Sequence, residues 1–146
     1  MTIEEVQQEI IDEFSIFTDW MDKYAFIIEQ GNKLPALDEK YKTPENIIKG
    51  CQSRVWLQAD YSDGKLHFQT ESDAIIVKGL LALVMRIFND RTCAEILDAD
   101  LRFIKEIGLT EHLSPTRSNG LLSVIKQIRF YAMAYQAKEG KIDQRS

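Results

Sequence analysis

The spacing of apolar residues near the N-terminus predicts two amphipathic helices. The first carries its apolar residues three or four positions apart, as one helical face requires, at Ile3, Val6, Ile10, Phe14 and Phe17. Thr2 and Glu5 have the residue types and spacing of a capping box at its start. A second helix is expected to follow a cap at Thr18 or Asp19 and to end at Gly31, because glycine tolerates the backbone angles found beyond a helix terminus.

The middle of the chain predicts a small antiparallel sheet. Residues 53–61 are rich in Val, Trp, Leu and Tyr, and residues 66–70 form a second run of the same kind. Asp63-Gly64 lies between the runs and is typical of a two-residue hairpin turn. Residues 46–49, after a polar loop over 34–44, are interpreted as a short third strand.

Helices are expected again in the second half of the chain. Residues 74–88 are apolar on most sides, which is typical of a core helix, and Ser72-Asp73 precedes them as a cap. Thr92 to Glu95 forms another capping box before a short helix, and residues 101–107 form a further helical turn.

The C-terminal part is interpreted as a polar loop followed by a helix. Residues 114–120 form the loop, and the tail from about residue 138 is expected to fray. The inner face of the helix is marked by Leu121, Ile125, Ile128, Ala132 and Tyr135. The order of helices, antiparallel strands and helices predicts an α+β fold, with a sheet of about three strands packed against helices from both ends of the chain.

Composition narrows the class of protein. The 146 residues fit one domain, spanning 1–146, and 45% hydrophobic with 28% charged residues is an ordinary balance for a soluble protein. A net charge of -5 without a basic stripe argues against nucleic acid as a partner. The N-terminus has no signal-peptide pattern, and the longest apolar run is too short to cross a membrane. Two cysteines far apart in sequence favour the reducing cytoplasm over a secreted disulfide framework.

Cys51 is the strongest candidate for covalent chemistry. It follows Gly50 and lies just before the first predicted strand, so a turn at the mouth of the hairpin would present its thiol. Gly50 permits unusual backbone angles and close approach of another molecule. Gln52 and Ser53 supply hydrogen-bond donors, which a thiolate needs at neutral pH. Free cysteines are also commonly buried and inert, so the residues alone leave both interpretations open.

The other candidates each have a simpler structural interpretation. Cys93 lies in a capping box and is interpreted as a helix-start or core residue. His67 and His112 lack the spacing of a zinc site, and a catalytic pair with Cys51 would require proximity in space. Asp73 suits the first turn of a helix, and Arg117 either fixes a loop or binds an anion near a helix start. Common nucleotide, zinc-protease and hydrolase motifs are absent.

Three motifs together resemble the SufE family of sulfur-acceptor proteins. They are Gly50-Cys51-Gln52-Ser53 with Val55-Trp56, then residues 72–80, and then residues 112–121. The likeness covers about residues 20–135, and the three motifs in this order are specific. One departure is Ser114-Pro115-Thr116 where Thr-Pro-Ser is usual in the family, a swap that keeps both hydroxyls. A CsdE-type paralogue has nearly the same motifs.

The resemblance implies a fold like that of the IscU-type scaffold and a role as a sulfur carrier. Cys51, supported by the loop residues Gly50, Gln52 and Ser53, would take persulfide sulfur from a SufS-like cysteine desulfurase and stimulate that enzyme. It would pass the sulfur to a SufBCD-like iron–sulfur scaffold complex. Asp73 and Arg117 would lie near the cysteine loop and the partner surface.

The same resemblance has consequences for cofactors and assembly. Pyridoxal phosphate would belong to the desulfurase, and this chain would hold no cofactor or metal and have no turnover alone. The resemblance is also compatible with a homodimer of this chain. Since persulfides are easily lost to oxidants and thiols, we expect an apolar shelter formed by Val55, Trp56 and the helix start at Ile75-Ile76.

Three other functions compete with the carrier. A scaffold that assembles the cluster itself generally supplies several thiolates, and this chain has two cysteines. A self-sufficient thiol enzyme would need a low pKa at Cys51 and an acid–base partner. In a plain interaction module, Cys51 would be inert.

Overall fold

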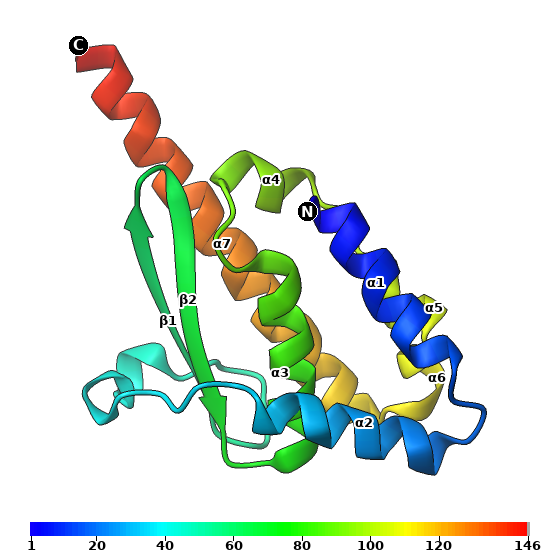
Figure 1. Ribbon diagram of the computed structural model, residues 1–146. Coiled ribbons are helices and arrows are strands. Elements are labelled where there is room, and N and C mark those ends of the chain that lie inside the picture. Colours follow the sequence, from blue (N-terminus) through cyan, green and yellow to red (C-terminus); the bar gives the residue numbers. More distant parts are fainter. Residues whose placement is uncertain (146) are drawn as a thin grey trace.

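The computed structural model of the chain describes residues 1–145, with side chains described as far as residue 140. The elements follow the order expected for an α+β fold, which is confirmed (Figure 1). They are α1 (Ile3–Ser15), α2 (Trp20–Asn32), β1 (Val55–Ser62), β2 (Lys65–Ser72), α3 (Ile75–Phe88), α4 (Cys93–Asp98), α5 (Phe103–Glu106), α6 (Leu109–His112) and α7 (Pro115–Arg145), with short 3-10 turns at Glu39–Tyr41 and Pro44–Asn46.

The two capping boxes predicted from sequence are confirmed. At α1, the Thr2 hydroxyl accepts a hydrogen bond from the Glu5 amide over 3.1 Å, and the Glu5 carboxylate accepts one from the Thr2 amide over 2.9 Å. Thr92 and Glu95 form the same pair at the start of α4. These contacts satisfy amides that have no partner within the helix, so they set where the helices begin.

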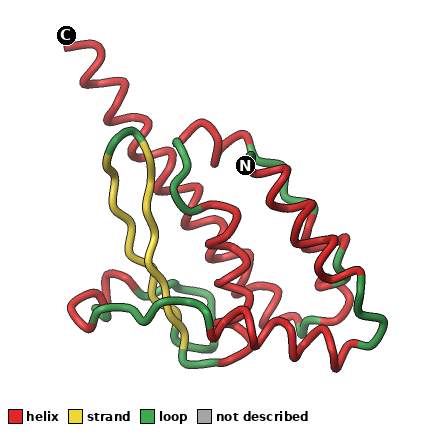
Figure 2. The backbone as a smooth tube through the Cα atoms, viewed as in Figure 1, coloured by secondary structure: helices red, strands yellow, loops and turns green. Residues whose placement is uncertain are grey.

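The hairpin turn is confirmed, but the expected third strand is not formed. β1 and β2 pair antiparallel, and Asp63 and Gly64 both have positive φ angles, 54° and 76°, as a two-residue turn of type I′ requires. The described residues contain a sheet of two strands (Figure 2). Pro44 instead begins a 3-10 turn, and Ile47 makes only a single bridge to Trp56.

Gly31 does not end α2, which continues to Asn32; it contacts α3 instead. A Cβ added at Gly31 would lie 2.8 Å from the Gly79 backbone nitrogen, and one at Gly79 would lie 2.1 Å from the Ile27 carbonyl oxygen. The two glycines therefore let the helix backbones cross at very short distance. This crossing fixes α3, whose residues 79–85 are all buried.

The core lies where α3 meets the inner face of the hairpin, α1 and α7. In Figure 1, α3 and α7 run side by side between the hairpin and α1, while α2 crosses near the N-terminal end of α3. Core side chains with almost no exposure come from all of these elements, including Ile10, Phe14, Ile27, Leu57, Leu66, Leu83, Ile87, Phe88 and Ile128.

The C-terminal helix is longer at both ends than the sequence indicated. Residues 114–120 are not a loop: α7 begins at Pro115, and the Ser114 hydroxyl accepts a hydrogen bond from the Arg117 amide over 3.2 Å. Serine before a helix with proline at its first position is a strong start signal. The helix also continues past residue 138 to Arg145. Shortly before residue 138, Tyr135 stacks on Tyr61 of β1, with ring centroids 5.1 Å apart.

We expect Gly79→Ala to destabilise the fold by about 2 kcal/mol or more, since the added methyl group would overlap the Ile27 carbonyl and force the helices apart. Gly140→Ala is the matched control. It is also a helical glycine, but a Cβ there meets nothing within 4 Å, so better helix propensity should stabilise by about 0.5–1 kcal/mol. Urea unfolding of both variants measures the difference, and equal stabilities would contradict the close crossing.

Candidate functional site

Cys51 lies on the loop that enters β1, at the end of the hairpin opposite the Asp63-Gly64 turn, as the sequence predicted. Gly50 has a φ of 92°, which is favourable only for glycine. On the N-terminal side of the loop, the Ile48 amide donates to the Val55 carbonyl over 2.9 Å. On the other side, the Arg54 amide donates to the Asp73 carboxylate over 3.1 Å, and the Asp73 amide donates to the Arg54 carbonyl over 3.3 Å.

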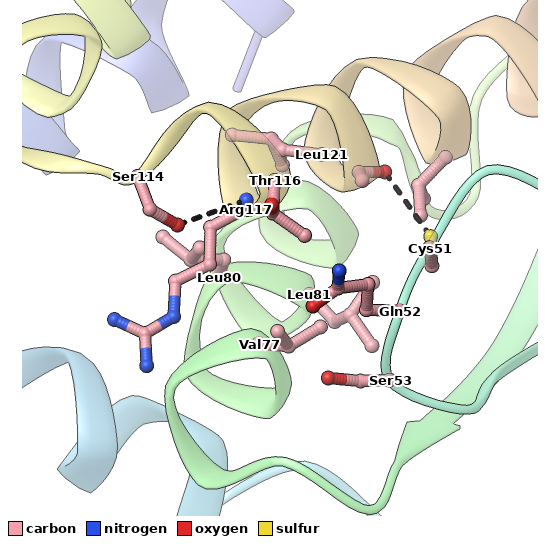
Figure 3. Close-up of a pocket in the computed structure, with 12 residues that line it drawn as sticks. Cys51, Gln52, Ser53, Val77, Leu80, Leu81, Ser114, Thr116, Arg117 and Leu121 are labelled. Carbon is pink, nitrogen blue, oxygen red and sulfur yellow. Dashed lines mark hydrogen bonds between the residues drawn. The ribbon is translucent and has the colours of Figure 1, made fainter.

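The loop forms one wall of a pocket of about 420 Å³, and α3 and the first turns of α7 form the others (Figure 3). Three stretches that are distant in sequence therefore meet at the thiol. The loop contributes Cys51, Gln52 and Ser53. The helices and the residue before α7 contribute Val77, Leu80, Leu81, Ser114, Thr116, Arg117, Gly120, Leu121 and Val124.

Asp73 and Arg117 occupy different places around this pocket. Arg117 lines it from the first turn of α7. Asp73 is outside the lining, and it holds the base of the loop through Arg54 instead of capping α3. The cap-like contact at α3 comes from the Ser72 hydroxyl, which accepts a hydrogen bond from the Ala74 amide over 3.2 Å.

The thiol of Cys51 is half-buried against α7. Its Sγ donates to the Gly120 carbonyl oxygen over 3.6 Å, and a Cβ added at Gly120 would lie 3.4 Å from the sulfur. Gly120 belongs to the third motif, but nothing in the sequence singled it out as a neighbour of Cys51. A glycine inside a helix, where it costs about 1 kcal/mol relative to alanine, is the signal that could have indicated a close contact.

The apolar shelter differs from the one expected. Val55 is fully buried in the core, and Ile75 is 65% exposed, so neither lines the pocket. The apolar walls are Val77, Leu80 and Leu81 of α3 with Leu121 and Val124 of α7. The expectation missed these walls because Leu121 and Val124 reach the pocket only through the packing of α7 beside α3, a contact between segments distant in sequence.

Burial raises the pKa of the Cys51 thiol above its ordinary value. The only charged side chain among the pocket residues is Arg117, and its guanidinium points away from the sulfur, toward the other side of the pocket (Figure 3). Lys49 and Arg54, the cations nearest in sequence, do not line the pocket. The thiol is therefore held in its protonated form at neutral pH, unlike a cysteine activated by a neighbouring cation.

Cys93 lies too far away to react with Cys51. It is buried at the start of α4, with its Sγ 3.9 Å from the Glu139 carboxylate. Cys51 contacts Gly120 on the same helix, α7. Because an α-helix rises about 1.5 Å per residue, positions 120 and 139 are roughly 28 Å apart. The two thiols cannot form a disulfide with each other in this structure.

Neither histidine lies at the pocket. His67 is on β2, where its Nδ1 lies 2.5 Å from the Asp90 carboxylate. His112 stacks on Trp20 with ring centroids 3.9 Å apart. Both have the structural or surface roles that the sequence favoured, and a Cys51–histidine pair is not formed.

Two further properties concern metals and membranes. Within the part of the chain that is described, no three His, Cys, Asp or Glu side chains gather closely enough to hold a metal ion. No helix in the same part has the length and hydrophobicity needed to cross a membrane.

Comparison with known proteins gives a consistent family and fold. A family model described as "SufE: Fe-S metabolism associated domain" matches residues 8–132. An uncharacterized SufE-like protein of Rhizobium meliloti (strain 1021) is 44% identical over 126 residues, covering 83% of this chain and 90% of that protein. The solution structure of a hypothetical protein from Thermus thermophilus aligns with a TM-score of 0.74 at 17% identity, covering 90% of this chain and 96% of that one. This structural likeness concerns the fold alone.

The raised pKa predicts a slow thiol with an unusual pH profile. In a Cys93→Ser background, so that only Cys51 reacts, we expect alkylation by iodoacetamide to be slower in the folded chain at pH 7 than in the urea-unfolded chain. The rate should rise with pH to a midpoint above that of a free cysteine, about 8.5, because burial disfavours the thiolate. A midpoint near or below pH 7 in the folded chain would contradict this electrostatic description.

Proposed function

The chain belongs to the SufE family, and on that basis we propose that Cys51 carries sulfur from a cysteine desulfurase to an iron–sulfur scaffold complex. Membership of the family places the protein in iron–sulfur metabolism. The observation that carries the finer proposal is the position of Cys51. It is the one thiol at a pocket formed where three sequence motifs converge.

The transfer itself is an exchange between thiols and needs no oxidant or reductant. The Cys51 thiolate attacks the outer sulfur of a cysteine persulfide on the desulfurase. A sulfur–sulfur bond forms to Cys51 while the original one breaks, and the desulfurase thiolate leaves with the bonding electrons and takes up a proton. A thiolate on the scaffold complex then attacks the outer sulfur on Cys51 in the same way.

The surroundings of Cys51 suit a carrier that is inactive until it docks. Half-burial and a raised pKa keep the thiol unreactive in the free protein, which limits side reactions with oxidants. The distance to Cys93 prevents an internal disulfide that would consume the persulfide. Docking would need to uncover the thiol, so we infer that the desulfurase supplies the conditions for transfer and is stimulated in return, while this chain has no turnover alone.

The competing functions receive less support from the same contacts. A cluster scaffold needs several converging thiolates, whereas Cys93, at the start of α4, lies beside Glu139 near the far end of α7, away from Cys51. A self-sufficient thiol enzyme needs an acid–base group beside the sulfur. The residues that line the pocket include no histidine and no carboxylate.

Replacing Cys51 tests the carrier directly. We expect the wild type and Cys93→Ser to stimulate a cysteine desulfurase and to gain mass equal to one sulfur atom after incubation with the enzyme and cysteine. Cys51→Ser should do neither, because it lacks the accepting thiol. Enzyme assays and intact-protein mass spectrometry provide the two measurements. Stimulation that survives in Cys51→Ser would refute persulfide transfer to Cys51 even though the family is established.

Arg117 is the second residue to test. Its side chain is exposed and forms no hydrogen bond or ion pair with the side chains described, so it is free to meet an anionic group of the partner. We expect Arg117→Ala to lower desulfurase stimulation about tenfold or more, the size of a lost charged hydrogen bond, without changing the urea midpoint. Lys126→Ala, on α7 but outside the pocket, is the control. A loss of stability in Arg117→Ala would instead assign the arginine a structural role.

A further inference from the structure

The cysteine loop rests on α7 through two neighbouring contacts. Its hydrogen-bonded anchors are Ile48 at one end and Arg54 at the other. Between them, Cys51 lies against Gly120, and Gly50 lies against Ser123. Residues three apart on a helix point to the same side, so Gly120 and Ser123 form one continuous surface beneath the loop.

The loop fits tightly against the helix at Gly50 and lies in ordinary van der Waals contact with it at Gly120. A Cβ added at Gly50 would lie 2.8 Å from Ser123 Oγ, closer than a real Cβ contact allows, and 3.7 Å from Ser123 Cβ. A Cβ added at Gly120 would lie 3.4 Å from Cys51 Sγ. Each contact therefore includes a glycine, opposite a serine in one case and the reactive cysteine in the other. A larger side chain at Gly50 or Ser123 would lift the loop.

We propose that Gly120 and Ser123 are positioning residues: together they form a seat for the Cys51 loop and set how far the thiol is withdrawn from solvent and from an incoming persulfide. The seat has no catalytic group of its own. It holds the sulfur against the Gly120 carbonyl and the apolar walls of the pocket, where the thiolate is disfavoured. Lifting the loop would expose the sulfur to water and to an incoming persulfide.

This inference rests on the proposed function only in taking Cys51 as the reactive thiol. Its test uses the isolated chain and a small alkylating reagent, so no partner protein is required. If the proposal of the seat is wrong, the results of the desulfurase assays are unaffected. If the proposal of sulfur transfer is wrong, the alkylation result still holds.

The first variant places a larger side chain in the seat, beneath the loop. In the Cys93→Ser background, we expect Ser123→Leu to raise the rate of iodoacetamide alkylation of Cys51 at pH 7.5 at least fivefold. The midpoint of its pH profile should move down toward that of the unfolded chain. Ser118→Leu makes the same substitution on α7, at a position outside the pocket and the seat, and should alkylate like its parent. A shifted pH midpoint separates release of the thiol from a general loss of stability, which urea unfolding monitors.

The second set of variants tests the contact from the loop side. Gly50→Ala should also speed alkylation, both by overlap with Ser123 Oγ and by strain at a φ of 92°. Adding Ser123→Ala removes the overlapping oxygen, and the remaining Cβ is 3.7 Å away. The double variant should therefore return part of the way toward the parent rate.

Two results would overturn the seat. One is a folded Ser123→Leu variant with the alkylation rate and pH midpoint of its parent. The other is a Gly50→Ala/Ser123→Ala rate equal to that of Gly50→Ala, which would show that strain at Gly50 alone controls the loop. If Ser123→Leu does not fold, the Gly50 variants decide the question.

Discussion

The crossing of α2 over α3 at Gly79 is the contact on which the rest of the structure depends. With a Cβ excluded by the Ile27 carbonyl, the two backbones approach closely enough to bury the middle of α3 completely. The next residues of α3, Leu80 and Leu81, are both core residues and walls of the cysteine pocket. A shift in the crossing would therefore be transmitted directly to the site, because packed interiors leave little free volume to absorb it.

α7 contributes to three features of the proposed carrier site. Its first turns, started by Ser114 and Pro115, bring Arg117 to the pocket. One turn further, Gly120 receives the Cys51 sulfur. Its far end, near Glu139, holds the second cysteine at a distance. One helix thus brings Arg117 to the pocket, supports the Cys51 thiol and keeps Cys93 far from it.

Local signals in the sequence predict much of the fold. Both capping boxes, the Asp63-Gly64 turn and the core helix 74–88 are correct because each depends on neighbours in the chain. The errors arise where a local signal has two meanings. Gly31 has the residue type of a helix end, but its lack of a side chain serves the α2–α3 crossing. Residues 114–120 are polar, which is typical of a loop. They instead form the start of α7, and their polar side chains lie at the edge of the pocket.

The sequence by itself determined the α+β class, the family motifs and the choice of Cys51 as the strongest candidate for covalent chemistry, because residue type and spacing carry that information. Only the tertiary structure decided what surrounds the sulfur: the Gly120 carbonyl, the Ser123 contact beneath Gly50 and the apolar walls from α3 and α7. The tertiary structure also gave Arg117 and Asp73 different places: Arg117 lines the pocket, whereas Asp73 holds the base of the loop. The pKa of a thiol depends on burial and nearby charge, and both are properties of residues that meet only when the chain has folded.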